Sequence, residues 1–191
     1  MEAARFLRLA IAGEAGLLLL SWALSRWLHI RLADQLHLSF RAILLGVIAS
    51  LPLLLGLRWT LRTKSKPITR LVQVVHDQLG PLVASRSPAE LAVVAALAGL
   101  AEEVLFRGVM QGELARRLPD FLALVLTSAA FGLAHFLTVS YALLAALAGL
   151  YLGALYSAQG NLLTPIIAHA VYDLVALMQL SRMYRARTIP G

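Results

Sequence analysis

The sequence predicts an all-α integral membrane protein with about six transmembrane helices. Two observations carry this prediction: 60% of the 191 residues are hydrophobic and only 14% are charged, and the hydrophobic residues gather in long runs. Soluble domains are about 45–50% apolar and about 25% charged. The chain therefore has too little polar surface to coat a water-soluble fold, and it is too hydrophobic to stay disordered.

Two apolar runs and a basic connector make up the N-terminal part of the chain. The runs cover Leu9–Ser25 and Ala42–Leu57, and Pro52 lies inside the second. The connector carries apolar residues at helical spacing, which predicts an amphipathic helix on the membrane surface. These residues are Leu71, Val74, Val75, Leu79 and Leu82. We expect His76 and Asp77 on the polar side of this helix.

Four further apolar helices follow in residues 87–180. The first begins at Ser87, which has the spacing of a capping box with Glu90, and it ends near the Arg116–Arg117 pair. The others are predicted at Phe121–Leu137, Tyr141–Ala158 and Leu162–Leu180. In Tyr141–Ala158 small residues recur every four positions, which predicts close helix packing. Residues 1–86 then form two transmembrane helices with their connector, and residues 181–191 a basic tail.

Most charged residues mark the ends of the apolar runs. The net charge is +7, and most Lys and Arg lie near the N-terminus, in the connector after the second run and in the tail, which six spans would place on one side. The positive-inside rule then predicts both termini in the cytoplasm. A small, loop-poor chain is typical of a prokaryotic cytoplasmic membrane. No basic stripe alternates with aromatic residues, so the expected partner is the lipid bilayer and no nucleic acid.

A few ionisable residues instead lie inside the apolar runs: Glu102, Glu103, Arg107, His135, His169 and Asp173. Each costs on the order of 3 kcal/mol at membrane depth, so a function is the default interpretation. Glu102 and His135 lie at nearly equal distances on either side of Pro119, and His169 lies at a similar depth. We expect these side chains to converge on one polar site near mid-membrane. A purely structural Glu103–Arg107 ion pair is an open alternative.

Three short motifs carry these residues in order. They are Glu-Glu-x-x-x-Arg from Glu102 to Arg107, Phe-x-x-x-His from Phe131 to His135, and His-x-x-x-Asp from His169 to Asp173. Together they resemble the CAAX prenyl protease and bacteriocin-processing (CPBP) family, also called the Abi family of intramembrane proteases. The resemblance covers about Ser87–Leu180. It implies a four-helix catalytic core that hydrolyses a peptide bond near the membrane surface without a covalent intermediate.

The resemblance also implies roles for the catalytic residues. Glu102 would be the general base that activates water, His135 would help to hold that water, and His169 with Asp173 would face the developing oxyanion. Glu103, Arg107 and Phe131 match the supporting positions of the family. The family's last motif ends in Asn or Asp, and an ionised Asp173 cannot donate to an oxyanion. We therefore expect Asp173 to hold His169 through its other ring nitrogen.

Zinc is the alternative to a metal-free mechanism. Glu102, His135 and His169 offer a plausible ligand set if the reaction depends on a metal. However, the chain has no His-Glu-x-x-His motif, because Phe136 follows His135 and Ala170 follows His169. The resemblance favours a glutamate mechanism without a cofactor. The absence of Cys also excludes a thiolate nucleophile and cysteine-bound metal.

Three classes of function compete for this site. The favoured one is an intramembrane endopeptidase whose substrate is a peptide or protein with a hydrophobic or membrane-anchored tail. The second is a non-enzymatic membrane immunity or scaffold protein that keeps the fold. The third is a proton-coupled transporter in which the buried carboxylates and histidines form a relay. No inverted repeat supports a transporter, and a scaffold has no need of all three motifs.

Overall fold

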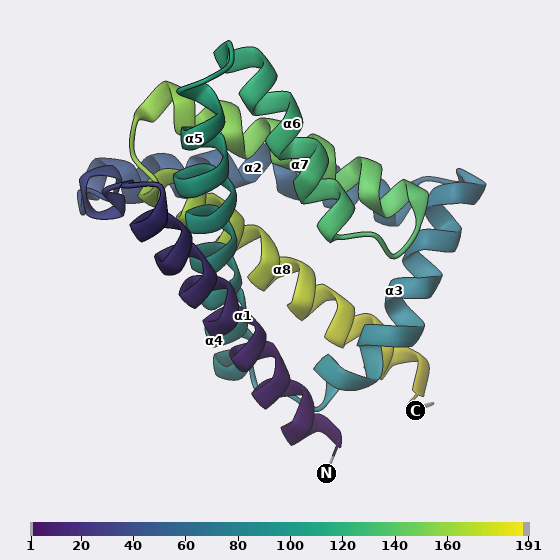
Figure 1. Ribbon diagram of the computed structural model, residues 1–191. Helices are drawn as coiled ribbons and strands as arrows, with labels where there is room; N and C mark the ends of the chain where they lie inside the picture. Colours follow the sequence, from purple (N-terminus) through teal and green to yellow (C-terminus); the bar gives the residue numbers. More distant parts are fainter. Residues whose placement is uncertain (1, 189–191) are drawn as a thin grey trace.

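The computed structural model describes residues 2–188, and these residues contain helices and no strands. The long helices are α1 (Glu2–Trp27), α2 (Phe40–Arg62), α3 (Lys66–Ala84), α4 (Pro88–Glu103), α6 (Asp120–Ala134), α7 (Val139–Gln159) and α8 (Leu163–Thr188). Three short elements join them: η1 (Leu32–Gln35), η2 (Val104–Gln111) and α5 (Gly112–Ala115). The all-helical class predicted from the sequence is confirmed (Figure 1).

Four of the described helices are long and apolar enough to cross a membrane: α1 from Leu7, α2, α7 and α8. The other two predicted spans fall short of these criteria. One of them is divided among α4, η2 and α5 and carries the charges of the Glu-Glu-x-x-x-Arg motif. The other is α6, whose 15 residues extend roughly 22 Å, less than a hydrocarbon core of about 30 Å.

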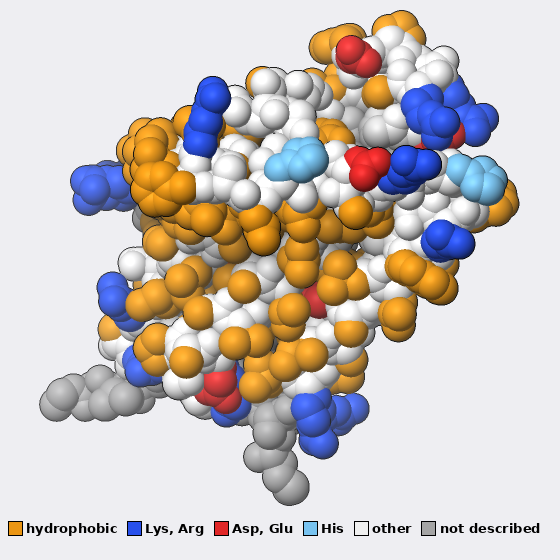
Figure 2. All heavy atoms as spheres, turned by 90° about the vertical axis from the view of Figure 1, so that its left-hand side faces the viewer, with side chains coloured by type: hydrophobic (Ala, Val, Ile, Leu, Met, Phe, Trp, Pro, Cys, Tyr) orange, Lys and Arg blue, Asp and Glu red, His pale blue; other side chains and the backbone are white. Residues whose placement is uncertain are grey.

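Hydrophobic side chains cover much of the outer surface, as a lipid environment requires. On α1, Leu19 is 68% exposed and Trp22 is 63% exposed, and α2 has several similar positions. Figure 2 shows one such face, where hydrophobic side chains fill the middle and most Lys and Arg lie toward the edges. In water such a surface would aggregate, whereas the acyl chains of a bilayer solvate it.

Helix α8 is the centre of the fold and packs against α4, α2, α3 and α7. Two glycines let its neighbours approach closely. A Cβ added at Gly99 of α4 would lie 2.9 Å from the backbone nitrogen of Ala170, and one at Gly46 of α2 would lie 2.6 Å from the Cβ of Ile167. Both approaches bring helices against the part of α8 that carries His169, so the packing positions the predicted site.

The predicted amphipathic helix is present as α3, but one assignment on it was wrong. His76 is buried, with 5% of its surface exposed, rather than on the polar side. Its ring packs 5.2 Å from that of Tyr184, and its Nδ1 lies 2.9 Å from Asp77 Oδ1. The reason is that α8 continues as a helix to Thr188 and covers this face of α3.

Candidate active site

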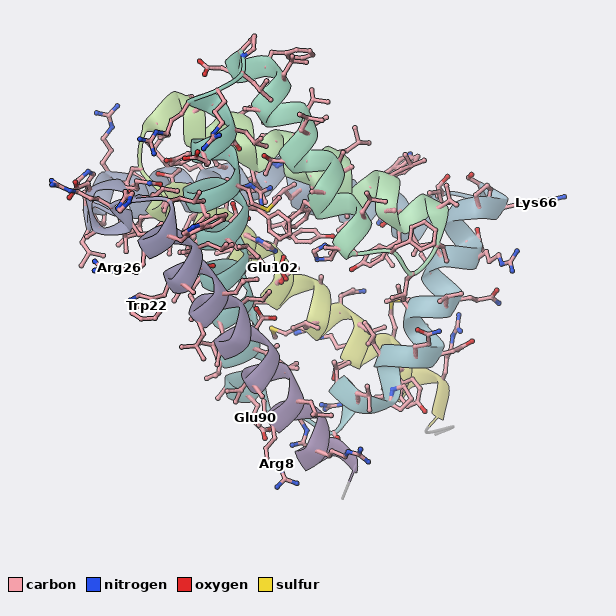
Figure 3. The ribbon with its side chains drawn as sticks, viewed as in Figure 1. Arg8, Trp22, Arg26, Lys66, Glu90 and Glu102 are labelled. Atoms are coloured by element: carbon pink, nitrogen blue, oxygen red, sulfur yellow. The ribbon has the colours of Figure 1, made fainter. Side chains whose placement is uncertain are left out.

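The predicted catalytic side chains come together from three helices. Glu102 lies near the end of α4, His135 directly follows α6, and His169 and Asp173 lie one turn apart on α8. Glu102 Oε2 is 3.4 Å from His135 Nε2 and 4.0 Å from His169 Nε2. Figure 3 shows Glu102 in the middle of the molecule, on the side of α4 that faces α8. The predicted convergence of these side chains is therefore present in the structure.

Glu103 lies beside Glu102 in sequence but has a different environment. Its side chain is fully buried, and its Oε1 accepts hydrogen bonds from Arg107 Nη1 at 2.9 Å and from His169 Nδ1 at 2.8 Å. Asp173 Oδ2 is 3.6 Å from His169 Nε2, beyond hydrogen-bonding distance. The carboxylate that orients His169 is therefore Glu103, rather than Asp173 as expected from the sequence.

Arg107 connects the site to α7. Its Nη2 donates to the backbone oxygen of Gly149 at 3.0 Å, and its guanidinium lies 4.6 Å from the centre of the Phe131 ring. One turn further, Gln111 Nε2 donates to the oxygen of Gly153 at 3.1 Å. A Cβ at Gly153 would lie 2.6 Å from Gln111 Oε1, so this glycine leaves the α7 backbone open to Gln111. The stripe of small residues on α7 thus serves polar contacts as well as close packing.

Arg107 and Gln111 both lie on a π-helical stretch, η2, which interrupts the helix after Glu103. A π-helical turn is wider than an α-helical turn and is frequent at functional sites. Sequence reasoning missed this stretch, since no Pro or Gly pair marks where it begins. The buried contacts of Arg107 and Gln111 with α7 offset the poorer backbone geometry of η2.

His135 is positioned by the end of α6. The helix stops at Ala134, and His135 Nδ1 lies 2.9 Å from the backbone oxygen of Phe131. A carbonyl oxygen only accepts hydrogen bonds, so Nδ1 carries the proton and donates. The Nε2 atom, which faces Glu102, is then a free acceptor in the neutral ring. The Phe131 ring supports the imidazole, with the two ring centres 4.4 Å apart.

A cavity of about 320 Å³ opens beside these residues. His135, His169 and Asp173 line one part of it, and the rest is mostly apolar and comes from α2, α3, α7 and α8. Tyr141 and Tyr172 also line this cavity, and the Tyr141 ring centre is 6.1 Å from that of His135. Sequence reasoning missed both tyrosines, because an aromatic residue in an apolar helix carries no distinguishing signal.

The described side chains do not form a ready metal site. Across residues 2–188, no group of three or more His, Asp and Glu side chains is placed to hold a metal ion. The three zinc ligands considered from the sequence, Glu102, His135 and His169, lie close together, and His169 donates from its Nδ1 to Glu103, which leaves its Nε2 facing Glu102.

Apolar helices around a buried cluster of glutamate and histidine side chains are typical of a membrane-embedded hydrolase. Residues 84–175 match the model of a family described as Rce1-like, type II CAAX prenyl endopeptidase. This match confirms the resemblance to the CAAX prenyl protease family and supports a membrane protease. No curated protein and no solved structure matches the chain. The matched segment contains every motif residue from Glu102 to Asp173.

Proposed function

We propose that the protein is an intramembrane endopeptidase in which Glu102 activates a water molecule for attack on a peptide bond. One observation carries this proposal. The Oε2 atom of Glu102 is buried without a hydrogen-bond partner among the described residues, and it faces the Nε2 atoms of two histidines. A buried carboxylate oxygen left without a donor is costly, so a water molecule beside Glu102 and the histidines would stabilise the site.

The hydrogen-bonding roles of the two acceptors orient that water. Glu102 Oε2 accepts one of its protons, and His135 Nε2, the free acceptor of a ring whose Nδ1 donates to Phe131, accepts the other. The oxygen lone pairs then point away from both groups. In the reaction, Glu102 takes one proton of the water while the oxygen bonds to the substrate carbonyl carbon. Glu102 later gives this proton to the leaving amine when the C–N bond breaks.

His169 is the group suited to the negative charge that develops on the carbonyl oxygen. With Nδ1 donating to Glu103, a second proton on Nε2 makes the ring a donor toward the cavity. Three carboxylates surround the ring, those of Glu102, Glu103 and Asp173. Their charges stabilise an imidazolium here, and Glu103 holds its orientation.

The cavity supports a substrate with a hydrophobic or membrane-anchored tail. Apart from the polar groups at the site, its wall is built from aliphatic side chains such as Leu53, Leu57, Leu144 and Leu177. An apolar chain entering from the bilayer would exchange lipid contacts for these side chains. The peptide bond next to that apolar chain would then lie beside the catalytic carboxylate.

Cleavage of defined peptides in liposomes tests the proposal. Two fluorogenic probes are suitable: a peptide with a prenylated CAAX terminus, and an unprenylated peptide with an apolar C-terminal tail. We expect cleavage of at least one probe, and a rate reduced by about 10²–10⁴-fold in Glu102→Gln. The matched control is Asp34→Asn, a carboxylate whose side chain is 68% exposed, which should cleave at the parental rate. Cleavage that survives Glu102→Gln, or that is lost in both variants, contradicts the proposal.

We also propose that both termini lie in the cytoplasm of a prokaryotic cell. Figure 1 supports a shared side for both termini, since the start of α1 and the end of α8 lie at the lower end of the view. The orientation follows from the basic residues of the second connector and the C-terminal part of α8. Fusions of a fluorescent protein and of alkaline phosphatase to each end would test it. Phosphatase activity at either terminus would reverse the assignment.

A further inference from the structure

Helix α1 lies outside the segment that matches the family, yet one of its side chains faces the site. Most of α1 is exposed to lipid, and only a narrow stripe of it turns inward. This stripe consists of Leu7, Ala10, Glu14, Leu17, Leu18, Ser21, Leu24 and Ser25. Glu14 is its only charged member. Trp22 and Arg26, in contrast, point outward from α1 (Figure 3).

The inward stripe packs on the helices that build the site. Helix α1 contacts α4 and η2. Leu17 and Leu24 pack against the buried cluster formed by Leu105, Phe106, Phe131 and Ala145. Phe131 is the ring that supports His135. Since Glu14 lies one turn before Leu17 on the same stripe, its carboxyl faces the same region.

Glu14 also lacks the local partner that the other polar residues of the stripe have. Ser21 donates to the backbone oxygen of Leu17, and Ser25 donates to that of Trp22. An ionised carboxylate has no proton to give to a helix carbonyl. Its Oε2 atom is buried and has no hydrogen-bond partner within the described part of the chain.

Glu14 and Glu102 lie on two helices that contact each other, α1 and α4. Each has a buried carboxylate oxygen without a donor in residues 2–188. Water between these two helices would supply donors to both.

We infer that Glu14 is a positioning residue, which closes the hydrolytic site on the α1 side and holds the water that hydrates Glu102. The inference rests on the proposed function, because its role is to supply ordered water to that reaction. Helix α1 then contributes a residue to the site, although the family match begins only at residue 84. In this role Glu14 does not touch the substrate, and it acts on Glu102 through water.

Cysteine labelling tests the hydrated space without any need for activity. The chain has no Cys, so Glu14→Cys introduces a single thiol. A charged methanethiosulfonate reagent reacts only with a thiol that water reaches, because it needs the thiolate. We expect Glu14→Cys to be labelled in liposomes, whereas Leu19→Cys, on the lipid-facing side of the same helix, stays unlabelled. No labelling of Glu14→Cys in protein that elutes as a folded species would overturn the inference.

Kinetics separate positioning from a merely structural role. We expect Glu14→Gln to lower kcat about 10-fold with KM within about twofold, Glu14→Leu to lower it further, and Glu14→Asp to recover part of the loss. Unchanged kcat in Glu14→Leu, or a lower Tm with unchanged kcat, overturns the inference. Failure of the parental protein to cleave either probe counts against the proposed function, while labelling still decides whether Glu14 faces water.

Discussion

Glu102 and Glu103 are neighbours in sequence, but they belong to two different halves of the site. The half around Glu103 is dry and paired: its side chain is 0% exposed, and it bonds to Arg107 and His169. The half around Glu102 is more open: its side chain is 13% exposed, it has an unpartnered buried oxygen within the described residues, and the neighbouring His135 and His169 line the cavity. Consecutive helical residues point about 100° apart, so one sequence pair serves both halves. The hydrogen bond from His169 to Glu103 in the paired half fixes the imidazole whose Nε2 faces Glu102 in the open half.

The largest effect on stability should come from breaking the paired half. Arg107→Met leaves the buried charge of Glu103 with His169 as its remaining partner, so we expect a loss of about 3–5 kcal/mol in the free energy of unfolding. Denaturant titration in mixed micelles, followed by circular dichroism, measures it. Arg117→Met is the matched control, because Arg117 pairs with Glu113 while its side chain is 70% exposed, and it should change stability by about 0–1 kcal/mol. Equal effects of the two variants would remove the distinction between the halves.

The next prediction concerns which carboxylate orients His169. The structure gives this role to Glu103, 2.8 Å from Nδ1, and leaves Asp173 3.6 Å from Nε2. We expect Glu103→Gln to lower kcat about 100-fold and Asp173→Asn to lower it less than about fivefold. Cleavage of the liposome probes by both variants, normalised to folded protein, checks this. A larger loss of kcat in Asp173→Asn than in Glu103→Gln would mean that Asp173 orients His169, as expected from the sequence.

A smaller effect is expected one turn beyond Arg107. Gln111 donates to the Gly153 oxygen at 3.1 Å and to Ser157 Oγ at 2.9 Å, so it joins η2 to α7. Gln111→Leu removes both bonds and should cost about 1–2 kcal/mol in the same denaturant titration. Gln159→Leu, at an exposed position of α7, is its control and should have no measurable effect. If Gln111→Leu also leaves the free energy of unfolding unchanged, the stabilising contacts of the paired half do not extend beyond Arg107.

The sequence predicted the open half better than the paired half. Depth counting along apolar runs placed Glu102, His135 and His169 together, because helical rise is uniform and charges at membrane depth are rare. The capping box of Ser87 and Glu90 was also predicted, and it is present. Both results depend on local spacing, which a sequence displays directly.

What the sequence did not predict depends on contacts between distant segments. The pairing of Glu103 with His169 and the bonds from η2 to the α7 backbone follow from how α4, α7 and α8 pack, and no local pattern encodes them. The burial of His76 depends on α8 continuing past its apolar stretch. Glu14 interrupts the apolar run Leu9–Ser25, and its environment becomes visible only when α1 is placed against α4.

The smallest predicted effect concerns a third carboxylate of α4, at the end opposite to the site. The Ser87 backbone N–H donates to Glu90 Oε2 at 2.8 Å, and this bond, with help from Arg86, lowers the pKa of Glu90 below its ordinary value of 4.5. A lowered pKa means that this stabilisation is complete above the unfolded pKa and is lost as the pH falls through the folded one. Glu90→Gln should therefore lower Tm slightly near neutral pH, and the difference should vanish below about pH 4. Thermal scans of both proteins across this range, with Asp34→Asn as the control for an exposed carboxylate, measure it. A difference in Tm that stays constant with pH would mean that Glu90 stabilises the helix through its shape rather than its charge. Charge effects of carboxylates on α4 would then be confined to Glu102 and Glu103.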